Sequence, residues 1–222
     1  MQIEINKLIR SKRQTISLIV ERDGSLTVRA PKRAAVAEIL SFLQEKSGWI
    51  HRAREKILSI VEIPKKEFKS GEVFLFLGKE YRLSLVTPQR PALKFDNGFT
   101  LGSTAQARGE KVFSQWYKKQ AYAVISERVE LFSSQYGFTP KRVKISSAKT
   151  RWGSCSPDGT LNFTWRLVMA PLEVIDYVIV HELCHLRVKD HSSRFWREVE
   201  KIMPEYRERR KWLRVNGERL SV

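Results

Sequence analysis

Residues 178–191 read Val-Ile-Val-His-Glu-Leu-Cys-His-Leu-Arg-Val-Lys-Asp-His, and no other stretch restricts the fold more. It holds His181, His185 and His191, three of the four histidines in the 222 residues. Residues four apart lie on one face of an α-helix, so the first two imidazoles can approach a single metal ion. Glu182, one position on, cannot be an equivalent ligand, but its carboxylate can reach a water bound to that metal. The pattern therefore predicts a metal centre.

The first two histidines are predicted to lie on a buried helix. Pro171 suits the first turn of a helix, where its missing N–H leaves no hydrogen bond unmade. Apolar residues recur at helical spacing after it: Val174, Ile175, Val178, Ile179, Leu183 and Leu186. The residues thus give a strongly apolar helix, and residues 181–185 lie within it.

A catalytic zinc ion takes three protein ligands and keeps a fourth position for water. His191, six residues past His185, is the predicted third ligand. Zn²⁺ is therefore the expected cofactor, with His181, His185 and His191 as its ligands. Glu182 is the expected general base.

Two other interpretations of the histidines are disfavoured. Histidines packed in a core without a metal would need many hydrogen bonds to offset the loss of water. A structural zinc site prefers four Cys or His ligands with no open position. The fourth histidine, His51, stands beside Arg52 and Arg54 and is interpreted as a surface residue.

The spacing from His185 to His191 equals that of the metzincins, whose pattern is H-E-x-x-H-x-x-G-x-x-H. Val188 stands at the position of that glycine. The glycine lets the chain turn sharply off the helix, and a β-branched residue does not easily adopt a positive φ. A metzincin is therefore disfavoured, and the chain must reach His191 by another route, for which Lys189-Asp190 is the candidate.

Two blocks of sequence resemble the YgjP-like metallopeptidases, relatives of the SprT-type zincins. The first block is Arg-Trp-Gly-Ser-Cys-Ser at 151–156, Leu-Asn-Phe-Thr-Trp-Arg-Leu at 161–167 and Ala-Pro at 170–171. The second is the histidine motif with Asp-His-Ser at 190–192, Phe-Trp at 195–196, Pro204, Tyr206 and Lys-Trp-Leu at 211–213. The resemblance is dense from about Val143 to Leu213 and weaker over the N-terminal part.

The resemblance implies an α+β fold with a zincin-like catalytic core: a long packing helix, a small antiparallel sheet and the active helix. The strand around Trp165 would then border the cleft, where an extended peptide adds as a further strand. Plain core packing is the favoured interpretation of Trp152, Trp165 and Trp196, because buried aromatics dominate cores. Cys155 is not a nucleophile, since no histidine remains to activate it. A second donor to the reacting carbonyl oxygen is also expected, and the unranked candidates are Tyr206, Arg194 and Arg207.

The remaining elements follow from periodicity. Apolar residues between Val112 and Phe132 predict one long helix that stops at Gly137. Strands are expected at 143–150 and 160–167, around a loop at 154–159.

The N-terminal part is predicted to be β-rich with helices. A hairpin turns at Asp23-Gly24, helical spacing covers 36–58 with a division at Gly48 and an end at Pro64, and short strands occupy 68–101. The small polar residues of 102–109 indicate a linker. The chain is therefore expected to form either two domains, an N-terminal hairpin and helix region (1–105) and a zincin-like metallopeptidase domain (106–222), or one continuous unit.

The chain is strongly basic, with 41 Lys and Arg against 24 Asp and Glu and a net charge of +17. Residues 1–70 hold 15 basic and 8 acidic side chains, residues 71–150 hold 13 and 6, and residues 151–222 hold 13 and 10. The excess lies mostly before the histidine motif. It is either a solvated surface or a surface that binds nucleic acid or an acidic partner.

The sequence thus predicts a zinc metallopeptidase that acts on peptides or proteins. Two rival functions are a DNA-associated protease acting on nucleic-acid-bound proteins, and a zinc-binding interaction module without turnover. No apolar run approaches the roughly 20 residues of a membrane span, and no signal peptide is recognisable. Cys155 and Cys184 are interpreted as reduced thiols, so a cytoplasmic location is expected.

Overall fold

The computed structural model describes residues 3–21, 23–58 and 65–222, and for residues 56–58 it describes the backbone alone. The chain divides into two compact units, Met1–Pro64 and Lys65–Val222. Each unit has its own buried core.

The first unit contains a three-stranded sheet. Its strands are β1 (Lys7–Ser11), β2 (Ser17–Val20) and β3 (Leu26–Pro31), in the order β1-β3-β2. β2 and β3 form the antiparallel hairpin predicted around Asp23-Gly24, and Gly24 has a φ of 79° in the turn. β1 adds to β3 in parallel.

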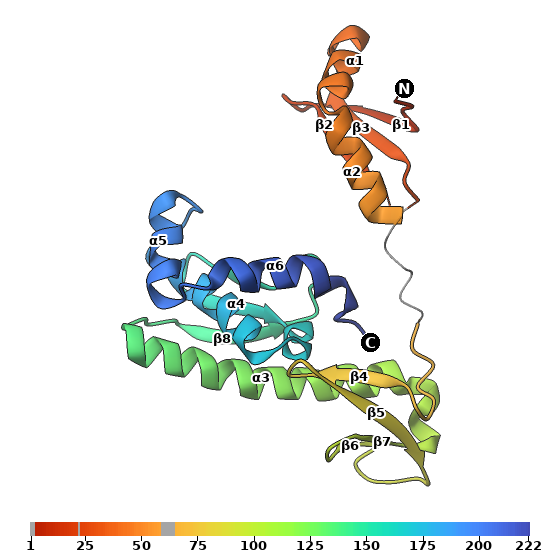
Figure 1. Ribbon diagram of the computed structural model, residues 1–222, viewed down its shortest axis with the longest axis vertical. Coiled ribbons are helices and arrows are strands. Elements are labelled where there is room, and N and C mark those ends of the chain that lie inside the picture. The colour runs from red at the N-terminus through yellow and green to blue at the C-terminus, as the bar shows by residue number, and fades with distance from the viewer. Residues whose placement is uncertain (1–2, 22, 59–64) are drawn as a thin grey trace. The chain divides into compact units, whose positions relative to one another are not determined.

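Two helices, α1 (Val36–Glu45) and α2 (Ser47–Leu58), cover one face of this sheet (Figure 1). Alternate residues of β3 pack with helix residues in a core of their own: Leu26, Val28, Ala30, Ile39, Leu43 and Ile50. The helices divide at Lys46, two residues before the predicted division at Gly48. The helix end predicted at Pro64 lies outside the described residues.

The second unit begins with a four-stranded sheet. Its strands are β4 (Val73–Phe76), β5 (Lys79–Val86), β6 (Leu93–Phe95) and β7 (Phe99–Gly102), in the order β4-β5-β7-β6. Gly78 turns the chain from β4 to β5 with a φ of 77°. A Cβ at this position would lie 2.8 Å from the Cα of Pro171. Only glycine therefore allows this turn to pack against the start of the histidine helix.

A long helix crosses the second unit. After a 3-10 helix (Ser103–Arg108), α3 (Gly109–Tyr136) runs beneath β8 and α4, and it ends at Gly137 in a left-handed conformation, as predicted (Figure 1). One face of α3 is buried at a spacing of about four residues: Phe113, Tyr117, Ala121, Ile125 and Val129.

A second small sheet lies beside α3. Its strands are β8 (Arg142–Ser146), β9 (Gly153–Cys155) and β10 (Thr160–Thr164), in the order β8-β10-β9. β10 pairs with β8 in parallel and with β9 in the antiparallel direction, so the sheet is mixed rather than wholly antiparallel. β9 includes Ser154 and Cys155, which the sequence analysis places in a loop.

Three further helices complete the unit. They are α4 (Leu172–Cys184), α5 (Ser193–Ile202) and α6 (Tyr206–Asn216), with 3-10 turns at Trp165–Met169 and Gly217–Arg219. α4 follows Pro171 as predicted, and most of its residues are buried. The predicted α+β class is confirmed. Within the described residues, no helix is both long enough and apolar enough to cross a membrane.

The division of the chain after Pro64 differs from the boundary expected after residue 105. The β4–β7 sheet is bonded to the histidine-bearing part: the Leu77 N–H donates to the Val168 carbonyl at 2.9 Å, and the Tyr117 hydroxyl donates to the Leu75 carbonyl at 2.6 Å. The stretch expected as a linker is a packed 3-10 helix. Its small residues serve close packing, which composition does not distinguish from a flexible connection.

A partly buried ion pair joins α3 to α4. Arg128 donates from Nε and Nη2 to the two carboxylate oxygens of Asp176, at 2.7 and 2.6 Å. The hydrogen bond to Asp176 raises the pKa of Arg128. Asp176 is 8% exposed, so loss of Arg128 would leave its charge unpaired in the interior.

We expect Arg128→Ala to lower the free energy of unfolding by about 3 kcal/mol, because it leaves the Asp176 carboxylate buried without a partner. The measurement is chemical denaturation at neutral pH. The matched control is Lys201→Ala, which breaks an exposed pair with Glu198 and should change stability by less than about 1 kcal/mol. Equal effects of the two substitutions would contradict this role of the α3–α4 pair.

Candidate metal centre

The end of α4 and the turn after it bring the three predicted histidines together. His181 and Glu182 lie in the last turn and a half of α4, and His185 caps its C-terminus. The Val188 N–H donates to the Cys184 carbonyl at 3.0 Å, which closes the last turn. His191 immediately precedes Ser192, the N-cap residue of α5. Two helix ends therefore supply the three imidazoles.

The three imidazoles point at a common space. The Nε2 atoms of His181 and His191 lie 3.0 Å apart. One ligand atom from each of the three histidines can be chosen so that all lie within 4.8 Å of one another. This convergence is what a shared metal ion requires.

Val188 orients one of the imidazoles. The Nδ1 atom of His185 lies 3.1 Å from the Val188 carbonyl oxygen. A carbonyl oxygen only accepts, so Nδ1 carries the proton and Nε2 is left as a free donor to a metal. Among the described non-glycine residues, positive φ values occur only at Phe68, Leu77 and Asn97. The chain thus leaves α4 without the conformation that the metzincin glycine supplies, and the residue in its place contributes a carbonyl.

The route to His191 runs through Lys189-Asp190, as expected. The Asp190 carboxylate accepts a hydrogen bond from the Ser192 backbone N–H at 3.1 Å. Hydrogen bonding from Ser192, through its side chain first and its backbone N–H second, lowers the pKa of Asp190, so the carboxylate is charged at neutral pH. It sits at the start of α5, where a negative charge is favourable.

One phenylalanine backs all three histidines. Phe195, on α5, is fully buried, and its ring centroid lies 4.4 to 4.9 Å from the ring centroids of His181, His185 and His191. The neighbouring Trp196 lies close to two of them, His181 and His191. In the sequence, Phe195 and Trp196 are recognisable only as part of a family motif. In the structure, Phe195 contacts all three imidazoles and Trp196 contacts two.

Burial favours the neutral form of His181 and His185, which is the form that binds a metal ion. Burial lowers the pKa of His181 to about 3, and the neighbouring His185 lowers it further. Burial also lowers the pKa of His185, against the hydrogen bond to Val188. The Nδ1 atom of His181 is buried without a hydrogen-bond partner. The donor set therefore fits a metal ion of the kind that binds imidazole nitrogen.

Glu182 lies against the edge of the second sheet. It is 5% exposed, and burial raises the pKa of its carboxyl group to about 7, an effect that the charge of Arg151 opposes. A Cβ at Gly153 would lie 2.6 Å from Oε1 of Glu182 and 2.7 Å from its Cγ. The glycine of β9 thus leaves room for the carboxylate. This contact explains why residue 153 is a glycine, which in the sequence is recognisable only as part of a motif.

The other residues singled out from the sequence occupy different places. Trp165 is 3% exposed and stacks on Tyr117 at 5.7 Å between ring centroids, so its role is core packing. Tyr206 is buried and stacks on Trp196 at 5.3 Å. Arg207 forms an ion pair with Glu200 on α5.

A cation that the sequence analysis did not single out lies near the histidines. The guanidinium of Arg210 lies 4.8 Å from the ring centroid of Trp196, and its charge contributes to lowering the pKa of His181. No motif in the sequence marks Arg210. Its approach depends on how α6 packs against α4.

The two cysteines are free, as expected. Cys184 is buried on α4, and burial raises the pKa of its thiol to about 12. Cys155 lies in β9, and burial raises the pKa of its thiol too. Both thiols are therefore protonated at neutral pH, and a thiolate is the form that attacks or binds metal.

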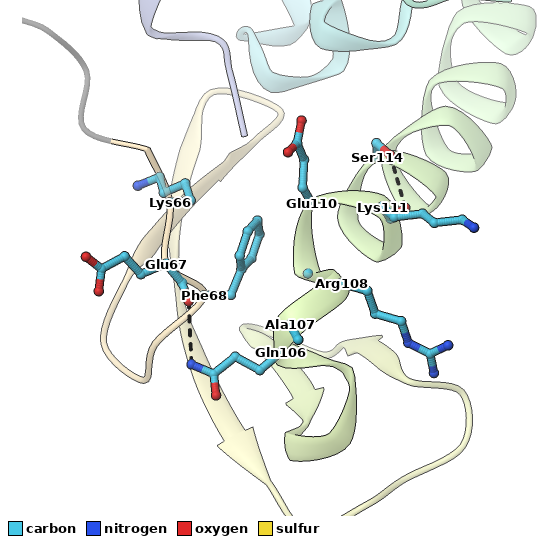
Figure 2. A pocket seen from close by; sticks show the side chains of 10 residues that line it. Lys66, Glu67, Phe68, Gln106, Ala107, Arg108, Glu110, Lys111 and Ser114 are labelled. Atoms are coloured by element: carbon cyan, nitrogen blue, oxygen red, sulfur yellow. Dashed lines mark hydrogen bonds between the residues drawn. The ribbon is translucent and has the colours of Figure 1, made fainter.

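A surface pocket of about 810 Å³ lies away from this site, where α3 begins (Figure 2). Its lining carries charges of both signs, including Lys66, Glu67, Arg108 and Glu110. The ring of Phe68 fills the space in front of Gly109. None of the predicted site residues lines this pocket, so it is no part of the candidate metal centre.

The comparison with protein families gives one match, to the family described as YgjP-like, metallopeptidase domain, over residues 14–216. The chain belongs to the YgjP-like family. The match runs through both compact units, so the hairpin and helices of the first unit are part of the YgjP-like domain. The chain is therefore a metallopeptidase, and its family implies a metal ion that the three histidines can hold.

Two further comparisons were made. The chain resembles the solved structure of the metallopeptidase zymogen of Pyrococcus abyssi abylysin, with 29% sequence identity and a TM-score of 0.38. That likeness covers 42% of this YgjP-like chain and 93% of the other chain. The comparison with curated proteins gave no match.

We expect Phe195→Ala to weaken the affinity for Zn²⁺ by about 10- to 100-fold, because the imidazoles lose the surface that holds their orientation. Titration of the metal-free protein with Zn²⁺ against a competing chelator measures this. Phe113→Ala is the matched control, since Phe113 is equally buried but lies in the α3 face of the core. Both variants should lose about 3 to 5 kcal/mol of stability. Equal zinc affinity in the two variants would show that Phe195 is only a packing residue.

Proposed function

We propose that this metallopeptidase uses zinc, held by His181, His185 and His191, and that Glu182 is its general base. The observation that carries the proposal is the convergence of the three imidazoles beside one buried carboxylate. Three protein ligands with an open fourth position are the composition of a catalytic zinc site. A structural site would be closed by a fourth ligand.

The distance between two of the imidazoles supports zinc. Each Zn–N bond is about 2.0 to 2.1 Å long, so two nitrogens on a tetrahedral zinc ion lie about 3.3 Å apart. The Nε2 atoms of His181 and His191 are 3.0 Å apart. Imidazole also binds copper, iron and nickel, so metal content is part of the test.

The chemistry divides between the ion and the chain. A bound zinc ion supplies a lowered pKa for its water and polarisation of the peptide carbonyl. Glu182 takes the proton of the attacking water on a carboxylate oxygen and later delivers it to the leaving amine nitrogen. The protonated amine then departs and the carboxylate is restored. Burial of Glu182 under Gly153 holds the carboxylate for both transfers.

The edge of the second sheet offers a place for an extended peptide. β9 pairs only with β10 among the described strands, so its other side is free. The Thr164 N–H donates to the Trp152 carbonyl and the Ser156 N–H to the Thr160 carbonyl. In an antiparallel ladder the backbone groups of Gly153 then point away from β10. A substrate strand added there would lie beside Glu182.

We expect Glu182→Gln to bind one zinc ion per chain and to lose at least about 100-fold in hydrolysis, because the amide accepts no proton. The measurements are metal content by elemental analysis and cleavage of an unfolded protein substrate. His185→Ala is the contrasting variant, which should lose zinc and activity together. Cleavage by Glu182→Gln at the wild-type rate would rule out Glu182 as the base.

We expect Gly153→Ala to reduce turnover by at least about 10-fold with zinc retained, because the new Cβ displaces the Glu182 carboxylate. Steady-state kinetics and metal content are measured together. Gly159→Ala is the control: Gly159 lies in the same loop region, with a φ of 83°, and its Cβ would have no contact shorter than 3.6 Å. That control should lose stability without losing zinc-dependent turnover per folded molecule.

The same assays separate the rival functions. An interaction module would hold one zinc ion and cleave no unfolded protein. A protease for nucleic-acid-bound proteins would cleave faster when DNA is added, with a strong dependence on salt. A free-standing peptidase, which we propose, cleaves unfolded protein without added DNA.

A further inference from the structure

Two segments of the first unit carry positive charge without any acidic residue. Residues 5–20 contain four basic residues and no acidic one, and residues 24–37 contain three basic residues and no acidic one. The same segments contain no aromatic residue. They form the three strands of the first sheet and the connections that follow β1 and β3.

The parallel pairing of β1 with β3 brings these segments together. The two strands end side by side, with Ser11 opposite Pro31. The Lys32 N–H donates to the Ser11 carbonyl at 3.1 Å, which places the connection after β3 beside the connection after β1. Lys12 and Arg33 lie in these same connections.

Two arginines extend the charge onto the open face of the sheet. Val28 and Ala30 pack in the core beneath the helices, so Arg29 between them points to the opposite face. Arg13 donates to the Ser17 hydroxyl at 2.9 Å, and Ser17 is paired with Arg29 across the β2–β3 ladder. We call this group the cationic edge; it consists of Lys12, Arg13, Arg29, Lys32 and Arg33.

The positive charge of the cationic edge is not balanced by ion pairs with acidic side chains among the described residues. Across residues 3–21, 23–58 and 65–222, none of its members forms an ion pair. All except Arg13, which is half-buried, are exposed. Arg10 differs, because its Nη1 atom donates to the carbonyls of Pro31, Lys32 and Ala34 and holds the connection in place. Arg10 therefore holds the shape of the edge, whereas the members of the cationic edge, which form no ion pair among the described residues, can bind an anion.

We propose that the cationic edge binds the phosphate backbone of double-stranded nucleic acid. Closely spaced Arg and Lys side chains without acidic neighbours suit a row of phosphates, and the arginine fork binds phosphate oxygens in pairs. Since the edge has no aromatic side chain on which an unpaired base could stack, contact is with the backbone and independent of base sequence. The surface lies in the first unit, so it holds none of the proposed zinc ligands and does not depend on catalysis.

The test uses the full chain, a fluorescein-labelled DNA duplex and anisotropy titrations between about 50 and 200 mM salt. Each phosphate contact contributes about −0.9 to the slope of log K against log salt. Arg29→Gln with Lys32→Gln should therefore flatten the slope by about 1.8. The charge-keeping pair, Arg29→Lys with Lys32→Arg, should retain the wild-type slope.

The matched control removes the same charge from the helical side of the unit, by Lys46→Gln with Arg52→Gln; Arg52 is exposed, and Lys46 is half-buried and paired with Glu45. It should leave the slope within about 0.5 of wild type. An unchanged slope in the Arg29 and Lys32 variant, or an equal loss in the control, would overturn the proposal.

Additional measurements distinguish nucleic-acid binding from binding of an acidic protein partner and from an effect of the catalytic site. Poly-glutamate should displace the duplex only weakly; binding of poly-glutamate as tight as that of DNA, with the same loss on changing Arg29 and Lys32, would instead indicate an acidic protein partner. Glu182→Gln should bind the duplex as wild type does. Hydrolysis of an unfolded protein should be equal in wild type and in the Arg29 and Lys32 variant without DNA.

Discussion

The approach of the His181 and His191 Nε2 atoms to 3.0 Å is the constraint on which the rest of the second unit depends. Two imidazoles on one helix face are easily arranged, but the third comes from the start of another helix. α4 must therefore be held against α5, and Phe195 does this by contacting all three rings. The Arg128–Asp176 pair holds the other side of α4 to α3.

Two glycines show how closely the histidine helix is surrounded. Gly78 lets the β4–β5 turn touch Pro171 at the start of α4, and Gly153 lets β9 touch Glu182 near its end. Both positions tolerate no Cβ without displacement of a neighbour. The β4–β7 sheet thus supports the same helix that carries the histidines, which is why it belongs to the second unit.

The two units differ in where their titratable and charged groups lie. The second unit is built around buried groups whose pKa values are shifted by the loss of water, as for His181 and Glu182. The first unit presents the cationic edge, whose members form no ion pair among the described residues. Groups whose pKa values are shifted by burial are typical of catalytic sites, whereas exposed positive charge in general attracts polyanions.

Local features could be predicted from the residues alone: the helix carrying His181 and His185, the long helix ending at Gly137 and the hairpin at Asp23-Gly24. Each depends on spacing, on capping or on turn residues, which act within a few positions of the chain. The resemblance of 151–167 and of the histidine motif to the YgjP-like family also came from sequence alone.

The contacts between these features depend on how the chain packs in three dimensions. The carbonyl of Val188 on His185, the ring of Phe195 behind three histidines and the contact of Gly153 with Glu182 join residues whose meeting depends on packing. The chain divides into compact units after Pro64 and not at the boundary expected after residue 105, and small residues that pack a 3-10 helix look like a linker in composition. The edge strand β9 (Gly153–Cys155) lies beside Glu182 only because α4 and the sheet are packed together, and no local sequence pattern predicts that contact.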